Sequence, residues 1–319
     1  MRSASGNAQA VSTSRRIALV TCAELPHLDH DTHRLLPRLL VRGLRPEPAV
    51  WDDPHVDWET FDLAIVRSCW DYVPRRRAFL EWTTRVPALA NPAGVLAWNT
   101  DKRYLRTLAR RGISTIPTEW VHPHDSWDPS SSGECVIKPA VSIASLDTGR
   151  YRLIDFLQRS LAIDHVRRLQ AQGRITLIQS YMPGVEHEGE TSLVYLGGRF
   201  SHAVRKAPSL AGPDTGVDRR FLSGGGLDPR PRRPTPAQLA LAERVLAAVP
   251  GGCRQLLYAR VDLAPDESGN PVLMELELTE PQLFLGTDDG AADRLAEAIA
   301  AKVGSLAMSN GRRSVRWAG

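Results

Sequence analysis

The chain has 319 residues, of which 42% are hydrophobic and 24% are charged, and its formal net charge is +4. These values are typical of a globular protein with two or three domains. They exclude a strongly basic nucleic-acid-binding protein, and no apolar run is long enough to span a membrane. The four cysteines lie far apart without the spacing of a zinc site, which favours reduced thiols in a cytoplasmic protein.

Residues 1–15 are mostly small and polar and lack the hydrophobic segment of a signal peptide, so we expect a disordered leader. Residues 16–97 alternate short apolar runs with helical spacing, which predicts a parallel sheet in an α/β domain. A helix is expected over Asp31–Val41, although Pro37 lies inside it. The predicted strands are Ile17–Cys22, Glu47–Trp51 and Leu63–Arg67.

Three polar residues follow the third of these strands. Arg67, Ser68 and Asp71 would lie at the carboxyl end of a parallel sheet, where ligands bind in α/β proteins. They are therefore candidate substrate contacts. The alternative is a loop held by salt bridges, with Trp70 and Tyr72 in the core.

Two lysines in the next part of the chain are candidates for binding phosphate. Thr100 is expected to cap a helix over Asp101–Arg111, and Lys102 would lie in its first turn, where the helix dipole favours anions over cations. Lys138 lies inside the predicted strand Glu134–Pro139, and a lysine within an apolar strand needs an anion or a wet edge. An ordinary surface lysine is the alternative for Lys102.

The middle of the chain contains an expected hinge. Loop Ala140–Arg150 is rich in small and hydroxyl residues and precedes a helix expected over Asp155–Gln172. A strand over Ile175–Gln179 then runs into Tyr181–Gly184, which we interpret as a hinge between two domains.

A β-hairpin is predicted around Gly197-Gly198, between strands over Gly189–Leu196 and Phe200–Lys206. The polar residues along it are Glu190, His202, Arg205 and Lys206. The next segment, Pro208–Pro236, is rich in glycine, proline and charged residues, and we interpret it as a mobile flap over a site. A helix over Pro236–Val249 follows.

The stretch Leu256–Phe284 carries a concentrated charge pattern on two predicted strands, Leu256–Leu263 and Val272–Leu278. Strand alternation places four charged residues on one face: Arg260, Asp262, Glu275 and Glu277. One arginine does not neutralise three carboxylates. The face is therefore either an ordinary solvated face or a site for a hard divalent cation such as Mg²⁺.

The order of these features resembles the ATP-grasp superfamily over about Ile17–Val303. The resemblance is carried by Asn99-Thr100-Asp101-Lys102, Val136-Ile137-Lys138-Pro139, Gln179-Ser180-Tyr181-Met182, Glu190, Arg205-Lys206, Arg260-Val261-Asp262 and Glu275-Leu276-Glu277. Several further strings resemble the O-ureido-serine cyclo-ligases that form D-cycloserine, a group similar to glutathione synthetases and ribosomal-protein glutamate ligases. These strings are Val20–Pro26, Arg67–Tyr72, Trp98–Lys102, Ser201–Lys206 and Glu275–Pro281.

The resemblance implies an ATP-grasp fold of class α/β, with α+β character in the C-terminal half and ATP held between the central and C-terminal of three domains. The implied boundaries are 16–97 for the N-terminal, 98–183 for the central and 184–306 for the C-terminal domain. Within the last of these, an amphipathic helix is expected around Ala291–Val303. A loose basic tail is expected over residues 307–319.

By position, the resemblance also implies roles for individual residues. ATP contacts are implied for Lys102, Lys138, Gln179, Tyr181, Met182 and Glu190. Ligation of Mg²⁺, as two ions and with Mn²⁺ as an alternative, is implied for Asp262, Glu275 and Glu277. Catalytic contacts with the transferring phosphate and the acyl oxygens are implied for Arg260, Arg205 and Lys206. The substrate side would comprise Arg67, Ser68, Asp71, His202, Thr279 and Glu280.

Two positions depart from the superfamily pattern. The last metal-ligand position often holds asparagine, whereas this chain has Glu277, which adds a negative charge. The loop over the phosphates is usually rich in glycine, whereas Ala140–Arg150 contains only Gly149, which puts its phosphate contacts in doubt.

The activity implied by the resemblance is that ATP phosphorylates a carboxylate and a nitrogen then attacks the acyl phosphate. Its sharpest form is the intramolecular cyclisation of O-ureido-D-serine to D-cycloserine in antibiotic biosynthesis. The alternatives are an intermolecular ligase that joins two amino acids and a non-catalytic nucleotide-binding sensor. The expected partner is a small amino-acid-like substrate, without nucleic acid or membrane, and a homodimer or higher homo-oligomer is an open alternative.

Overall fold

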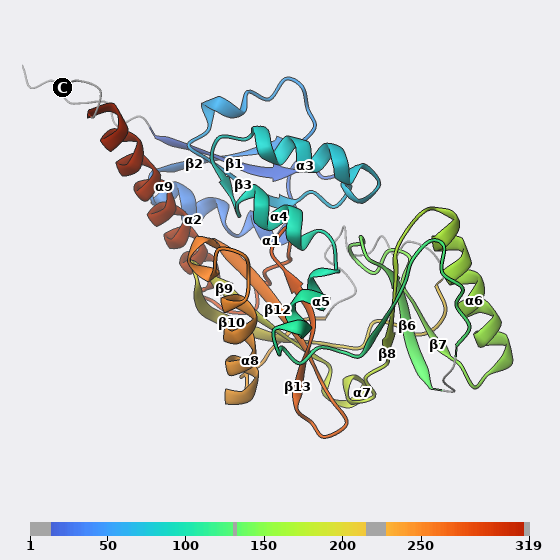
Figure 1. Ribbon diagram of the computed structural model, residues 1–319. Coiled ribbons are helices and arrows are strands. Elements are labelled where there is room, and N and C mark those ends of the chain that lie inside the picture. Colours follow the sequence, from blue (N-terminus) through green and yellow to red (C-terminus); the bar gives the residue numbers. More distant parts are fainter. Residues whose placement is uncertain (1–13, 130–132, 215–227, 316–319) are drawn as a thin grey trace, which may run out of the picture.

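The computed structural model describes residues 14–129, 133–214 and 228–315, which form three sheets and their covering helices (Figure 1). Most of the expected leader, the middle of the expected flap and the end of the expected tail lie outside the described residues. Within these ranges, no helix combines the length and the apolar character needed to cross a bilayer.

The first sheet is parallel, has the strand order β2-β1-β3-β4, and confirms the expected α/β architecture of this part. Its inner strands are apolar because both faces of the sheet are covered, and every residue of β3 is buried. The elements are β1 (Arg15–Thr21), α1 (His30–His33), α2 (Leu36–Val41), β2 (Leu44–Val50), η1 (Trp58–Thr60), β3 (Leu63–Ser68), η2 (Val73–Arg75), α3 (Arg76–Arg85) and β4 (Leu89–Ala90).

The single helix expected over Asp31–Val41 is wrong, because this stretch forms the two short helices α1 and α2. Asp29 caps α1 by accepting a hydrogen bond from the backbone N–H of Thr32. Pro37 lies in the first turn of α2. Backbone N–H groups there have no acceptor within the helix, so the proline removes no helical hydrogen bond. The proline therefore starts a new helix within the expected one.

The second sheet is antiparallel, with the order β5-β8-β6-β7, and helix α6 covers one of its faces. The helix expected over Asp155–Gln172 forms as α6, and Asp155 caps it by accepting from the backbone N–H of Gln158. The elements are β5 (Thr118–Val121), β6 (Glu134–Pro139), β7 (Gly149–Arg152), α6 (Phe156–Ala171) and β8 (Thr176–Ser180).

The third sheet is also antiparallel and has the order β11-β10-β9-β12-β13. Helix α8 packs on β12 and β13, whereas α9 packs on β9 and β10. The elements are α7 (Gly184–Glu188), β9 (Glu190–Leu196), β10 (Arg199–Lys206), β11 (Arg230–Pro231), α8 (Pro236–Ala247), η4 (Cys253–Gln255), β12 (Tyr258–Pro265), β13 (Pro271–Glu277) and α9 (Ala291–Val315).

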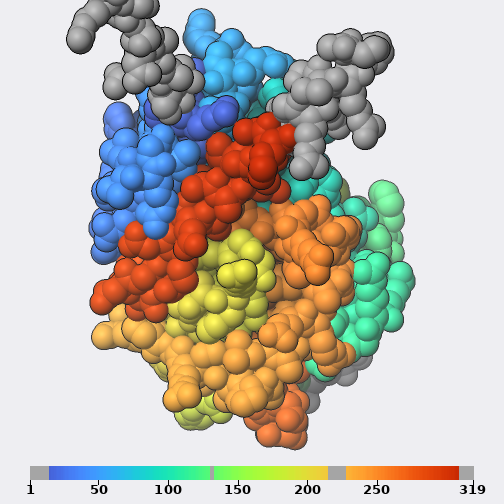
Figure 2. All heavy atoms as spheres, turned by 90° about the vertical axis from the view of Figure 1, so that its left-hand side faces the viewer, coloured from blue at the N-terminus to red at the C-terminus, as the bar shows by residue number. Residues whose placement is uncertain are grey.

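Helix α9 joins the first and third sheets into one core. In Figure 2 it runs diagonally between the N-terminal part in blue and the strands in yellow. Leu295 and Ile299 are buried in a cluster that also contains Leu39 of α2 and Val194 of β9. The helix continues to Val315, so the expectation of a loose tail from residue 307 is wrong for that stretch.

The helix expected over Asp101–Arg111 also differs from the structure. Two helices, α4 (Ala93–Asn99) and α5 (Tyr104–Arg110), are separated by a turn that contains Lys102. Asn99 holds this turn against β13, since its Nδ2 donates to the carbonyl of Leu276 at 2.7 Å and its Oδ1 accepts from the N–H of Leu278 at 2.7 Å. The backbone N–H of Lys102 donates to the carbonyl of Ala140 at 2.8 Å. Tertiary hydrogen bonds thus fix a turn where local propensity favours a helix.

Candidate functional site

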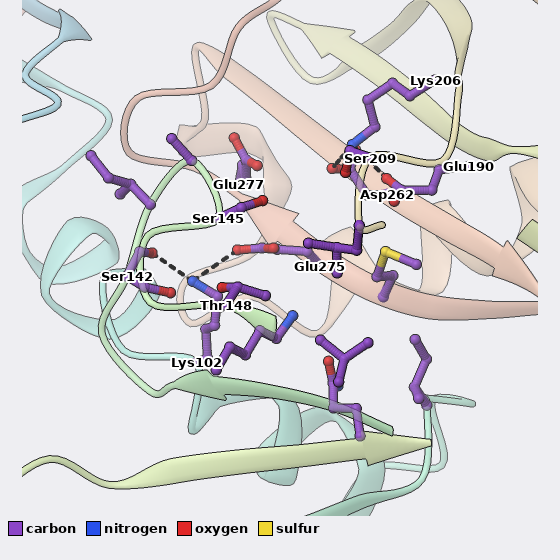
Figure 3. Close-up of a pocket in the computed structure, with 18 of the residues that line it drawn as sticks. Lys102, Ser142, Ser145, Thr148, Glu190, Lys206, Ser209, Asp262, Glu275 and Glu277 are labelled. Atoms are coloured by element: carbon purple, nitrogen blue, oxygen red, sulfur yellow. Dashed lines mark hydrogen bonds and ion pairs between the residues drawn. The ribbon is translucent and has the colours of Figure 1, made fainter. Parts of the chain in front are cut away.

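A cavity of about 830 Å³ lies between the second and third sheets, and its lining includes strands β6, β12 and β13 (Figure 3). This volume is within the range of sites that hold nucleotide-sized ligands. Most of the residues predicted from the sequence line this cavity. They are Lys102, Lys138, Gln179, Tyr181, Met182, Glu190, Lys206, Arg260, Asp262, Glu275, Glu277, Thr279 and Glu280.

The β12–β13 hairpin supplies the charged floor of the cavity. Its antiparallel register pairs Arg260 with Glu277 and Asp262 with Glu275. Cross-strand partners share a face, so all four side chains point into the cavity. A register shift directly after Asp262 ends this regular pairing. The alternation in the sequence therefore identified one charged surface correctly.

Asp262 is held by two cations. Arg260 contacts both of its carboxylate oxygens at 2.9 Å, and the Lys206 ammonium lies 2.9 Å from Oδ2. Burial alone would raise the pKa of Asp262, but these two cations hold that pKa well below its ordinary value. The Lys206 ammonium also lies 2.7 Å from Glu190, so β9, β10 and β12 meet in one charge network.

Glu275 faces the two lysines that the sequence marked as phosphate candidates. The Lys102 ammonium lies 3.1 Å from Glu275 and donates to the carbonyl of Ser142 at 2.6 Å, as the dashed lines in Figure 3 show. Burial would raise the pKa of Glu275, but the charges of Lys102 and Lys138 lower it. Burial lowers the pKa of Lys138, and Glu275 counteracts that effect.

At Glu277, in contrast to Glu275, the effects that raise the pKa outweigh those that lower it. It forms an ion pair with Arg260, yet burial and the nearby charges of Asp262 and Glu275 raise its pKa to about 7. Over the described residues, the cavity lining as a whole has five carboxylates and four cationic side chains, so its negative charge exceeds its positive charge by one. Within the described residues, no group of three His, Cys, Asp or Glu is gathered closely enough to hold a metal ion, and the carboxylates contact Arg260, Lys206 and Lys102 instead. The donor set nevertheless fits a hard divalent cation, because its atoms are all carboxylate oxygens with excess charge.

The other end of the cavity is mainly apolar. Ile116, Val136, Met182, Val185 and Met274 line it. At its edge, the guanidinium of Arg150 lies 3.5 Å from the centroid of the Tyr181 ring. The side-chain amide of Gln179, which also lines the cavity, donates to the hydroxyl of Thr118 at 3.1 Å. A planar heterocycle would bury its faces at this end of the cavity.

Residues 207–214 cross from β10 to the second sheet, and 207–213 line the cavity. The backbone N–H of Arg150 donates to the carbonyl of Gly212 at 2.8 Å. The N–H of Asp214 donates to the Tyr151 hydroxyl at 3.2 Å, and the carboxylate of Asp214 pairs with Arg168. This part of the expected flap is therefore fastened to the second sheet, whereas residues 215–227 lie outside the described residues.

Two predicted residues of β10 do not line the cavity. Arg205 points away from it, because consecutive residues of a strand face opposite sides and Lys206 occupies the inner one. Its guanidinium donates to the carbonyl of Glu188 at 2.7 Å. His202 shares the face of Lys206 but is buried under the segment that follows β13, where its Nε2 lies 2.9 Å from the carbonyl of Leu283.

The three candidates from the first sheet also lie outside the cavity lining. Arg67 is only 1% exposed, and its Nη2 donates to the carbonyl of Pro281 at 3.3 Å. Ser68 lies 3.2 Å from the hydroxyl of Thr21. Asp71 accepts from the Trp51 indole at 2.9 Å and forms a salt bridge with Arg75, which matches the alternative of a loop held by salt bridges.

Several lining residues were not singled out from the sequence. Trp70 and Tyr72 line the cavity from the loop after β3, and Tyr72 also packs in the core, as the alternative interpretation of this loop expected. Ser142, Ser145 and Thr148 line it from the loop between β6 and β7. The hydroxyl-rich composition of that loop was the available signal. Three of its residues other than glycine have positive φ, namely Ala144 at 47°, Ser145 at 57° and Asp147 at 52°. The loop thus adopts left-handed turns without glycine.

Comparison with known proteins gives concordant matches. The family model for the N-terminal domain of the D-cycloserine synthetase DcsG matches residues 17–93. The cycloserine biosynthesis protein DcsG of Streptomyces lavendulae is 35% identical over 305 residues, which cover 90% of this chain and 98% of that protein. The crystal structure of the D-cycloserine synthetase DcsG superposes with a TM-score of 0.78 at 32% identity, covering 90% of this chain and 99% of that one.

More distant structures share the fold. An ATP-grasp RimK domain protein from Sphaerobacter thermophilus has a TM-score of 0.61 at 16% identity, with 89% of this chain and 98% of that chain covered. The D-alanine–D-alanine ligase from Bacillus anthracis, solved in complex with ATP, has a TM-score of 0.59 at 15% identity, with 93% and 99% covered. These likenesses concern the ATP-grasp fold alone.

Proposed function

The chain belongs to the DcsG family of ATP-grasp ligases, and we propose on this basis that it closes the ring of O-ureido-D-serine to form D-cycloserine with consumption of ATP. The membership confirms the resemblance found in the sequence. The single observation that carries the proposal within this structure is the convergence of predicted lysines, arginine and carboxylates on one cavity. That cavity has a charged floor at one end and mainly apolar side chains at the other.

The proposed chemistry has two steps. The carboxylate of O-ureido-D-serine attacks the γ-phosphate of ATP, which gives an acyl phosphate and ADP. The aminooxy nitrogen of the same molecule then attacks the acyl carbon, phosphate leaves, and an isoxazolidinone ring forms. The product lacks the carbamoyl group of the substrate, so the balanced reaction also consumes water and releases carbon dioxide and ammonia.

The charged floor would position the phosphates. Lys102, Lys138 and Lys206 are buried cations beside the carboxylates, and Arg260 presents a planar donor group for the transferring phosphate and the acyl oxygen. Phosphoryl transfer depends mainly on such positioning and charge stabilisation, because the protein forms no covalent bond. Arg205 faces the other side of β10, and we leave it out of this set.

Asp262, Glu275 and Glu277 would hold Mg²⁺, as two ions and with Mn²⁺ as an alternative. When bound there, Mg²⁺ would supply positive charge that neutralises the phosphates of ATP. The support for this assignment is the gathering of three carboxylates on one face of the cavity, where burial and repulsion from Asp262 and Glu275 raise the pKa of Glu277 to about 7. A phosphate group arriving with the metal would offer Lys102 and Lys206 new anionic partners in place of Glu275 and Asp262.

The mainly apolar end would hold the adenine ring, with Tyr181, Met182 and Gln179 among the residues that line it. Glu190 would lie toward the ribose. The segment 207–214 would exclude water from the acyl phosphate, which hydrolyses readily.

An assay of ADP release tests the proposal. The purified protein is incubated with ATP, Mg²⁺ and O-ureido-D-serine, with and without a second amino acid, and D-cycloserine is quantified alongside ADP. We expect equimolar ADP and D-cycloserine without any acceptor. A strict requirement for a second amino acid would indicate an intermolecular ligase instead. Absence of ADP release with every amino acid tested would favour a nucleotide-binding sensor.

A further inference from the structure

Five carboxylates line the cavity, and they differ in how their charge is balanced. Within the described residues, four of them have a cationic side chain within 4 Å. Glu190 and Asp262 pair with Lys206, Glu275 pairs with Lys102, and Glu277 pairs with Arg260. Glu280 has no such ion pair among the described residues and contacts the hydroxyl of Tyr72 instead. Among the described residues, Glu280 is therefore the lining carboxylate that has no ion-paired cation.

The unpaired atom of Glu280 is well defined. Its Oε1 accepts from the Tyr72 hydroxyl at 3.2 Å, whereas its Oε2 is buried and has no hydrogen-bond donor in the part of the chain that the structure describes. Burial and the charge of Glu277 raise the pKa of Glu280 to about 8. A buried carboxylate oxygen without a donor is unfavourable, and a cation beside it would remove that cost.

The backbone that carries Glu280 is held from several sides. Four consecutive carbonyls each accept a hydrogen bond from a side chain. The donors are the Tyr258 hydroxyl to Thr279 at 2.9 Å, the Trp70 indole to Glu280 at 3.2 Å, Arg67 to Pro281 at 3.3 Å and Arg260 to Gln282 at 3.0 Å. Such a segment presents its carboxylate in a fixed position, as binding sites require. Arg67 thus supports the site through the backbone, although it does not line the cavity.

We propose that Oε2 of Glu280 binds the α-ammonium group of the amino-acid substrate and thereby selects a free, positively charged amino acid. This inference rests on the proposed function and names a recognition element of the same site. In an α-amino acid, the ammonium nitrogen and the carboxylate carbon are attached to the same carbon atom. The ammonium site must therefore lie beside the phosphoryl-transfer site, and Glu280 lines the same cavity as Glu277 of that site. An N-acylated or peptide-linked amine would place a neutral group against the carboxylate and would be rejected.

The test compares two ligands that differ only in the amino group, O-ureido-D-serine and 3-(ureidooxy)propanoate. Their affinities for protein loaded with ADP and Mg²⁺ are measured by calorimetry for the wild type, E280Q and the control E267Q, which removes a charge from the exposed turn between β12 and β13. We expect the wild type to bind the amino compound at least tenfold more tightly than the propanoate. E280Q should weaken binding of the amino compound at least tenfold and binding of the propanoate less than threefold, whereas E267Q should change neither.

The outcomes separate this inference from the proposed function. Equal wild-type affinity for the two ligands would reject the role of Glu280 even if E280Q did not fold. Equal weakening of both ligands by E280Q, or an unchanged affinity with a lower kcat, would also reject it. A higher Mg²⁺ requirement for ADP release in E280Q would assign the residue to the metal instead. If the wild type neither bound nor converted O-ureido-D-serine, the proposed function itself would fail, and this inference with it.

Discussion

The ammonium group of Lys102 lies 3.1 Å from the carboxylate of Glu275, which joins the turn between α4 and α5 to strand β13. The two residues come from segments far apart in the sequence, and they meet only because Asn99 fixes the turn against β13. The pair closes one side of the cavity. In the proposed reaction, both members change partners when ATP and Mg²⁺ bind.

Substitution of Glu275 by glutamine tests this part of the site. The amide retains the size of the side chain but removes the charge that would ligate Mg²⁺, so we expect ADP release to fall at least a hundredfold. The fold should persist, because the amide keeps the shape of the side chain and only its charge interactions with Lys102 and Lys138 are lost. The measurement is ADP release together with thermal unfolding. E267Q is the matched control, and wild-type activity in E275Q would reject the metal assignment.

Asn91 should be a major contributor to stability. It is fully buried, its Nδ2 donates to the carbonyls of Tyr258 at 2.9 Å and Leu278 at 2.8 Å, and its Oδ1 accepts from the N–H of Leu257 at 2.7 Å. Substitution by alanine would leave three buried backbone groups without partners. We expect a loss of about 2–4 kcal/mol in the free energy of unfolding.

Denaturant unfolding of the Asn91→Ala variant measures this loss. Asn270→Ala is the control, because Asn270 is exposed in the turn between β12 and β13. A difference of less than about 1 kcal/mol between the two variants would contradict the expected role of Asn91.

The charged floor could be predicted from the sequence because its signals are local. Strand alternation alone places Arg260, Asp262, Glu275 and Glu277 on one face, and a lysine within an apolar strand marks Lys138. Strand alternation did not indicate which of Arg205 and Lys206 faces the cavity. Adjacent residues face opposite sides of a strand, and β10 contains a register shift between Phe200 and His202 that only the pairing with β9 reveals.

Features that depend on distant segments escaped prediction. The stretch Ala93–Asn99 has no clear capping signal, and the break before α5 is fixed by hydrogen bonds to β13 and to Ala140. Trp70 and Tyr72 carry no local sign that they would reach Glu280. The composition of the segment after Lys206 predicted a flap over a site. The contacts that attach this segment to Tyr151 and Arg168 are tertiary, and no local pattern encodes them.

The stability of the ligand-free protein should depend on pH through Glu280. Its pKa is about 8 in the folded protein, above its ordinary value of 4.5, because the side chain is buried and lies near Glu277. With a pKa raised on folding, the contribution of this carboxyl group is fully present below about pH 4.5, decreases as the unfolded chain ionises, and is lost once the pH has risen through about 8. The Glu280→Gln variant lacks this dependence.

Thermal unfolding at about pH 6 and about pH 9 measures the effect. The melting temperature of the wild type should fall more than that of E280Q over this interval, by about 2–4 °C for each kcal/mol of lost stability. Parallel pH profiles for the two proteins would show that Glu280 titrates as an ordinary exposed carboxyl group.

The attachment of segment 207–214 to the second sheet should control the coupling of ATP use to product formation. A Cβ added to Gly149 would lie 2.5 Å from the backbone nitrogen of Asp214 and 2.6 Å from the Tyr151 hydroxyl, so Gly149→Ala must displace the segment. Water would then reach the acyl phosphate, and we expect ADP release to exceed D-cycloserine formation at least threefold. Gly212→Ala is the matched control, because a Cβ there meets no atom within 4 Å and the segment keeps its backbone hydrogen bond to Arg150. Equal ratios of ADP to product in both variants would mean that the attachment does not protect the intermediate.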